Sequence, residues 1–96
     1  MKQATETEIQ VALKTLAGWS VAGGKLHKKY VFADFIHAFG FMATCAIAIE
    51  KMDHHPEWAN VYNRVTVDLT THDAGGISAK DFELAALLDS FAEKLK

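Results

Sequence analysis

The stretch from Asp34 to Met52 places the strongest constraint on how this 96-residue chain can fold. Asp34 is a favourable helix N-cap, and the residues after it predict one long helix that ends near Met52. One apolar stripe along this helix consists of Phe35, Ala38, Phe39, Met42, Ala46 and Ile49. A second face is also nearly uncharged, and it consists of Ile36, Gly40, Ala43, Ile47 and Ala48.

A helix with two apolar faces needs a packing partner on each side. One face can pack on a sheet of its own domain, but a chain of 96 residues has little material left to cover the other. The alternative is a helix that is wrapped on all sides by its own core. We favour self-association and expect a homodimer or a homotetramer.

The N-terminal part of the chain predicts a helix followed by a β-hairpin. Apolar residues recur at helical spacing from Thr7 to Ala17, and Gly18 is a good helix stop. Gly23 and Gly24 then separate two short strand patterns, over 19–22 and 25–32, which is typical of a hairpin.

The C-terminal part predicts a second hairpin and a last helix. Residues 57–61 and 64–70 have strand patterns, and Tyr62-Asn63 is the expected turn because asparagine tolerates positive φ. Ser78 and Asp81 form a capping-box pattern that opens the last helix. The inward-facing residues of the second strand should be Val65, Val67 and Leu69. The resulting order is α-β-β-α-β-β-α, an α+β fold with a four-stranded antiparallel sheet and helices on one face.

Composition limits the classes of function. The formal charge of −2, from 10 basic and 12 acidic side chains, provides no basic surface for nucleic acid. Cys45 is the single cysteine, so neither an intramolecular disulfide nor a multi-cysteine zinc site can form, and we expect a buried thiol. With neither a signal-peptide pattern nor an uncharged membrane-spanning stretch, we expect one cytoplasmic domain over 1–96 that does not contact membranes.

Histidines are concentrated in two short segments that flank the second hairpin. His54 and His55 precede its first strand, and His72 follows its second. Imidazole, with a pKa of about 6.5, is the side chain best suited to exchange a proton near neutral pH. Counting outward from the turn, Val61 faces Arg64, so the histidine pair should lie near His72.

The neighbours of the histidine pair suggest different roles for its two members. Adjacent side chains of an extended chain project to opposite sides, so His54 and His55 should not act identically. Pro56 restricts the backbone of His55, and Trp58 offers a flat apolar surface. Acidic residues that could orient or charge a histidine are Glu50, Asp53 and Asp73. This set would suit acid–base chemistry on a flat heterocyclic substrate.

Three alternatives stay open from the residue pattern alone. A zinc ion could be held by His54, His55 and His72, although the usual His-x-x-x-His helical spacing is absent. A serine or cysteine nucleophile is less well supported, because Cys45 lies in an apolar helix and no serine has an elbow motif. The histidines could also serve only as hydrogen-bonding groups in loops.

Longer motifs resemble one known family. They are Phe32-x-Asp34-Phe35-x-x-Ala38-Phe39-Gly40-Phe41-Met42, Glu50-Lys51-x-x-His54-His55-Pro56-x-Trp58, Val61-Tyr62-Asn63-x-Val65 and Thr71-His72-Asp73-x-Gly75-Gly76-Ile77-Ser78-x-x-Asp81. Together they resemble the pterin-4a-carbinolamine dehydratases, and the resemblance extends from about Trp19 to about Ala85.

The resemblance implies an enzyme that dehydrates 4a-hydroxytetrahydrobiopterin to quinonoid dihydrobiopterin and so regenerates the cofactor of aromatic amino-acid hydroxylases. It implies dimers formed through sheet edges and tetramers formed through the long helix. The family's active-site residues correspond to His54, His55, His72 and Asp81. Many relatives have arginine where this chain has Lys80, and lysine cannot make the same bidentate contact.

The implied reaction needs one general acid and one general base, so we expect no metal and no cofactor. We expect His54 and His72 to transfer protons and Asp81 to orient a histidine or hold a pterin N–H. The expected substrate contacts also include His55, Glu50, Pro56 and Trp58. Which histidine is the acid is left open. Alternative functions are a dimerisation cofactor for a homeodomain transcription factor and a role in other pterin or molybdopterin metabolism.

Overall fold

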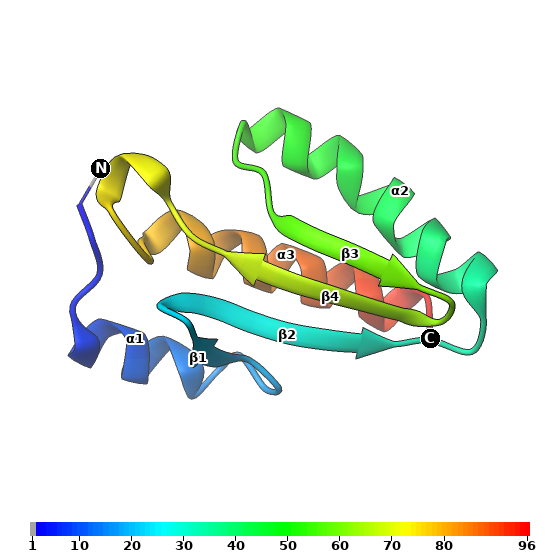
Figure 1. The fold of residues 1–96 in the computed structure, drawn as a ribbon, viewed down its shortest axis with the longest axis horizontal. Helices are drawn as coiled ribbons and strands as arrows, with labels where there is room; N and C mark the ends of the chain where they lie inside the picture. Colours follow the sequence, from blue (N-terminus) through cyan, green and yellow to red (C-terminus); the bar gives the residue numbers. More distant parts are fainter. Residues whose placement is uncertain (1) are drawn as a thin grey trace.

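A computed structural model describes residues 2–96 and contains a four-stranded antiparallel sheet and three α-helices (Figure 1). The elements are α1 (Glu6–Leu13), β1 (Ser20–Ala22), β2 (Lys25–Val31), α2 (Phe35–Met52), β3 (Glu57–Val61), β4 (Arg64–Leu69), the 3₁₀ turn η1 (His72–Ala74) and α3 (Ala79–Lys94). This order confirms the predicted α+β fold.

The sheet joins two hairpins side by side. Its strand order is β1-β2-β4-β3, with β2 paired to β4 from Leu26↔Leu69 to Val31↔Arg64. Alternate side chains of β2 and β4, such as Tyr30 and Val65, are buried toward the helices. The sheet therefore has one covered face, and β1 and β3 are its edges.

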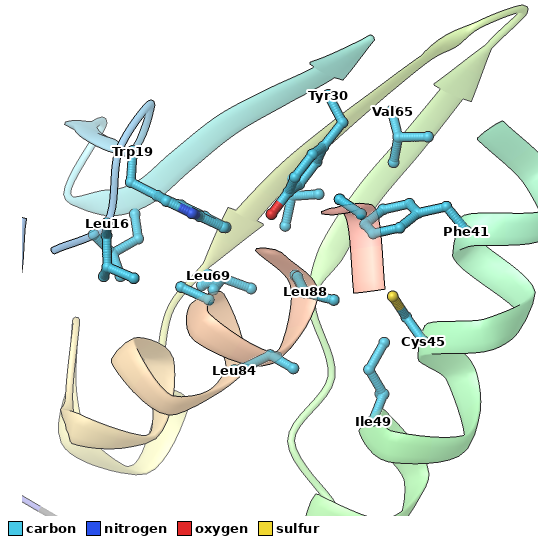
Figure 2. Close-up of a cluster of buried hydrophobic side chains, with 14 of the residues drawn as sticks. Leu16, Trp19, Tyr30, Phe41, Cys45, Ile49, Val65, Leu69, Leu84 and Leu88 are labelled. Atoms are coloured by element: carbon cyan, nitrogen blue, oxygen red, sulfur yellow. The ribbon is translucent and has the colours of Figure 1, made fainter. Parts of the chain in front are cut away.

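The core fills the space between the sheet, α2 and α3 (Figure 2). Its labelled side chains are Leu16, Trp19, Tyr30, Phe41, Cys45, Ile49, Val65, Leu69, Leu84 and Leu88. Cys45 is completely buried, as expected, and burial raises the pKa of its thiol to about 12. Asp89 of α3 ties this helix to the sheet, because it accepts hydrogen bonds from Trp19 Nε1, Lys28 Nζ and Tyr30 Oη.

The long helix α2 begins after Asp34 and ends at Met52, as predicted. The first apolar stripe predicted from the sequence faces the core only in part: Ala38 and Ile49 are buried, and Met42 packs against the core. The buried residues are Ala38, Phe41, Cys45 and Ile49. Of the predicted stripe, Phe35, Phe39 and Ala46 are exposed. Because α2 is apolar almost all round, helical spacing alone cannot decide which side faces the sheet.

By length and composition, α2 is also apolar enough to cross a membrane, a test that the core helix of a soluble protein passes too. Its buried face packs in the core, and its last turn carries Glu50 and Lys51. We therefore regard α2 as the core helix of this fold.

Helix α1 is shorter than predicted, since it ends at Leu13 and not at Ala17. The chain continues in tight turns, in which the N–H groups of Thr15 and Leu16 donate to the carbonyl groups three residues earlier. Such i→i+3 bonds close a helix tightly, and here they place Leu16 in the core.

The turn of the second hairpin consists of the predicted residues, but the positive φ is not at Asn63. Tyr62 has the positive φ, 51°, and Asn63 does not. The Asn63 side chain instead donates from Nδ2 to the carbonyl oxygen of Phe32 at 3.0 Å. Asn63 therefore fastens this turn to the end of β2, a tertiary contact that a turn propensity does not contain.

Candidate functional site

The two histidine segments meet at a pocket of about 260 Å³ near the C-terminal end of β4. Its lining residues are Asp53, His54, His55, Thr70, Thr71, His72, Asp73 and Lys80. The register of the second hairpin is the predicted one, with Val61 paired to Arg64. The segments before β3 and after β4 are therefore neighbours in space, as we expected.

His54 forms the buried wall of this pocket. Its Nε2 lies 2.6 Å from Oδ1 of Asp81, whose side chain is fully buried, and only 10% of the His54 side chain is exposed. Asp81 is in the first turn of α3, where the helix dipole favours a negative charge. A histidine and a carboxylate from distant parts of the chain thus form one hydrogen-bonded pair.

The second oxygen of Asp81 is held by two further donors. Oδ2 accepts the Thr71 hydroxyl at 2.9 Å and the Ser78 backbone N–H at 2.9 Å. The Thr71 and Ser78 hydroxyl oxygens are themselves 2.6 Å apart, and both residues are buried. The predicted capping box of Ser78 and Asp81 is present. Thr71 belongs to one of the family motifs, but its residue type did not indicate a role.

His55 has a very different environment. Its side chain is 57% exposed, and its Nε2 lies 3.2 Å from Oε1 of Glu50, which is more exposed still. The two adjacent histidines therefore differ in exposure and in hydrogen-bond partner. His54 is anchored at the wall, and His55 lies at the rim beside Glu50.

His72 reaches the pocket from the other side, on η1. Its side chain is fully exposed, and its Nδ1 lies 3.6 Å from Oδ1 of the neighbouring Asp73. Lys80, in the first turn of α3, also lines the pocket. Sequence reasoning did not include Thr70 among the candidates, since a threonine at the end of a strand carries no distinctive signal.

Four of the expected site residues are not among those that line the pocket. Asp81 lies behind His54, and Glu50 and Pro56 flank the histidine pair. Trp58 lies on β3 and packs against the core. It therefore supports the strand that leads away from the pocket.

The remaining polar groups bear on the alternatives. Within residues 2–96, no group of three or more His, Cys, Asp or Glu side chains is arranged to hold a metal ion. Cys45 is buried with its pKa raised, the opposite of an activated nucleophile. His27 pairs with Asp68, and His37 pairs with Asp34, both away from the pocket. The site thus combines one buried histidine–carboxylate pair with two exposed histidines, a set suited to proton transfer.

Comparison with known proteins gives a consistent result. Residues 2–91 match the family Pterin 4 alpha carbinolamine dehydratase. A curated relative from Solibacter usitatus (strain Ellin6076) is 66% identical over 92% of this chain and 93% of its own. Another, from Rhodopseudomonas palustris (strain BisB18), is 50% identical over 99% of this chain and 96% of its own. Both are named "Putative pterin-4-alpha-carbinolamine dehydratase".

A solved structure agrees with the fold. The crystal structure of a "transcriptional coactivator/pterin dehydratase" from Brucella melitensis is similar to this chain with a TM-score of 0.91 and 43% sequence identity. The similarity covers 95% of this chain and 99% of that one. The family match and these relatives cover nearly the whole chain, and the chain belongs to the pterin-4a-carbinolamine dehydratase family.

Proposed function

We propose that this protein dehydrates 4a-hydroxytetrahydrobiopterin to quinonoid dihydrobiopterin and water. The observation that carries the proposal is the placement of His54 and His72 at one pocket, one buried against a carboxylate and the other exposed. Family membership supports the substrate class. In the cell, this reaction would regenerate tetrahydrobiopterin for aromatic amino-acid hydroxylases, and we place the protein in the cytoplasm.

The reaction requires two proton transfers. The N5–H proton leaves to a base, the N5–H electron pair forms the N5=C4a double bond, and the C4a–O bond breaks as an acid protonates the departing hydroxyl. Each transfer by a positioned side chain typically contributes about 10²–10⁴-fold. Histidines can fill both roles near neutral pH, because neutral and protonated imidazoles coexist there.

We assign the two proton transfers to His54 and His72, with Asp81 orienting His54. His55 and Glu50, at the rim, would contact the edge of the pterin ring. Pro56 and Trp58 would hold the start of β3, and with it His55, in position. Neither transfer requires a metal or a cofactor.

The direct test is a dehydratase assay on freshly generated 4a-hydroxytetrahydrobiopterin. We expect acceleration over the uncatalysed dehydration by the wild-type protein, and a rate at least about tenfold lower for His54→Ala. A folded wild-type protein that does not accelerate the reaction would contradict the proposal.

The exposed side of α2 supports a second proposal, which concerns assembly. Four large apolar residues are exposed there: Phe35 at 49%, Ile36 at 77%, Phe39 at 56% and Ile47 at 78%. We propose that a second copy of this chain covers this face. The edge strand β3, which has unpaired backbone groups, is a further place where two copies could pair.

The same α2 face would serve the alternative function, a non-enzymatic dimerisation cofactor of a transcription factor. The description of the Brucella melitensis protein as a coactivator favours keeping this candidate. A dehydratase that is fully active but also binds such a factor through α2 would satisfy both. An inactive protein that still binds would favour the alternative alone.

A further inference from the structure

Four side chains at the wall of the pocket and behind it form one continuous series of hydrogen bonds. It runs from the Ser78 hydroxyl to the Thr71 hydroxyl, then to Asp81, and then to His54, with donor–acceptor distances of 2.6, 2.9 and 2.6 Å. Ser78, Thr71 and Asp81 are 0%, 5% and 0% exposed. Among the described residues, no buried side-chain nitrogen or oxygen is left without a partner, so every member of this series is satisfied.

The donor and the acceptor can be assigned for each hydrogen bond in this series. Thr71 has a single hydroxyl proton, and its hydroxyl donates to Oδ2 of Asp81. The Ser78 hydroxyl must therefore be the donor in its 2.6 Å contact with the Thr71 oxygen. Ser78 Oγ in turn accepts the backbone N–H of Lys80 at 3.3 Å. The hydrogen bonds therefore lead from Ser78 through Thr71 to the Asp81 carboxyl group.

Both polar groups that contact Oδ2 of Asp81 are hydrogen-bond donors. Oδ2 accepts two hydrogen bonds, from Thr71 and from the Ser78 backbone, and such bonds are stronger when the acceptor is charged. An ionised carboxylate has no proton to give, so the 2.6 Å contact to His54 must be donated by the imidazole Nε2–H. The lone pair of a neutral His54 is then on Nδ1.

We infer that Thr71 and Ser78 are positioning residues. The Thr71 hydroxyl, itself held by the Ser78 hydroxyl, orients the Asp81 carboxylate and thereby fixes His54 as the Nε2–H tautomer with Nδ1 available at the pocket. The inference rests on the proposed function in one respect, because it makes Nδ1 the atom through which His54 exchanges a proton with the substrate. It holds whether His54 acts as acid or as base. Asp81 would stabilise the imidazolium in either case.

The hydroxyl of Thr71 can be tested by paired substitutions. Thr71→Val keeps the shape but removes the donor, and we expect kcat to fall about tenfold with KM little changed, as for a group that acts only through another. Thr71→Ser keeps the hydroxyl and should retain activity close to wild type. Thr66→Val is the matched control, because Thr66 lies on β4, the strand that leads to Thr71, but is not among the residues that line the pocket.

Two kinetic outcomes would overturn the inference. One is a Thr71→Val protein with unchanged kcat. The other is a Thr71→Ser protein that loses as much activity as Thr71→Val, since the role of the side chain would then be steric.

A second measurement needs no substrate and no variant. Nitrogen-15 NMR of the imidazole rings distinguishes the two neutral tautomers, and we expect the His54 signals of the wild-type protein to be those of the Nε2–H form. The Nδ1–H form would overturn the inference even if the enzyme is active. If the protein has the Nε2–H tautomer but no dehydratase activity, the proposed function fails and the positioning of His54 stands.

Discussion

Nε2 of His54 lies 2.6 Å from Oδ1 of Asp81, and a second pair with the same chemistry lies elsewhere in the molecule. On the sheet, Nδ1 of His27 is 2.9 Å from Oδ1 of Asp68. The first pair is at the wall of the pocket, and the second is on the face of the sheet away from the core, with about a third of each side chain exposed. The chain therefore contains its own matched control for the role of a histidine–carboxylate pair.

The first prediction concerns the histidines. We expect His54→Ala and His72→Ala each to lower dehydratase turnover at least about tenfold, because each removes one of the two proposed proton-transfer groups. His27→Ala should leave turnover nearly unchanged, since the His27 side chain pairs with Asp68 and does not line the pocket. Steady-state rates of the three variants, with circular dichroism to verify folding, provide the measurement. Equal losses in all three would refute the assignment of the site.

The second prediction concerns the unit formed by His54 and Asp81. Asp81→Asn should lower turnover about as much as His54→Ala, and the double variant should be little worse than either, because residues that act as a unit are not additive. Asp68→Asn is the control and should have little effect. Fully additive losses in the double variant would show that Asp81 acts independently of His54.

Much of the fold could be predicted because its signals are local. The paired glycines at 23 and 24, the Asp34 cap and the Ser78 capping box each fix a boundary through the backbone conformation or hydrogen bond that they provide. The rotation of α2 could not be predicted, because Phe35 and Phe41 are equally apolar. Only the shape of the sheet and α3 decides that Phe41 enters the core.

For the site, too, the features that could be predicted are those that depend on local rules. The proximity of His54 to His72 followed from counting residues along one hairpin, which is a local rule. The role of Thr71 could not be derived, because its contact with Asp81 joins the residue before η1 to the first turn of α3. The spacing of residues also could not indicate that Trp58 packs against the core. It likewise gave no indication that Thr70 lines the pocket.

The third prediction concerns metal. Because the proposed dehydration uses only two proton transfers, activity should survive exhaustive chelation followed by gel filtration. The measurement is the dehydratase rate before and after treatment, together with the metal content of both samples. Stoichiometric zinc that is lost together with activity, and that restores activity when added back, would support a metal-dependent mechanism.

The fourth prediction concerns alkaline pH. Burial raises the pKa of the Cys45 thiol to about 12, whereas an unfolded cysteine has a pKa of about 8.5. Because the folded pKa is the higher one, the stabilising effect is complete below the unfolded pKa and is lost as pH rises toward the folded one. Above about pH 8.5, the free energy of unfolding should decrease by up to about 1.4 kcal/mol per pH unit.

Urea denaturation at several pH values between about 8 and 10 measures this slope. Near the upper limit Tyr30 also begins to contribute, because an unfolded tyrosine has a pKa of about 10 and burial raises the pKa of Tyr30. The comparison with Cys45→Ala separates the two contributions. Cys45→Ala should be less stable at neutral pH, because it leaves a small cavity, but its stability should depend less on pH. A slope as steep as that of the wild type would show that another group is responsible.

The fifth prediction concerns assembly through α2. Ala43 and Ile47 are both exposed and lie one helical turn apart on the second apolar face predicted from the sequence. If a second copy covers this face, a carboxylate at each position would be buried without a partner, which commonly costs several kcal/mol. We therefore expect a dimer or tetramer for the wild type by light scattering, and a smaller species for Ala43→Glu with Ile47→Glu.

The matched control introduces the same two charges on another helix. Ala86 and Ser90 are exposed and one turn apart on α3, so Ala86→Glu with Ser90→Glu should leave the assembly unchanged. The smaller α2 species should keep part of its activity if it folds, because none of the residues that line the pocket comes from this face. A wild-type protein that is monomeric at micromolar concentration would refute self-association through α2. The exposed face, with Ile36 and Ile47 more than three-quarters exposed, would then need a partner of another kind, and the transcription-factor alternative would gain support.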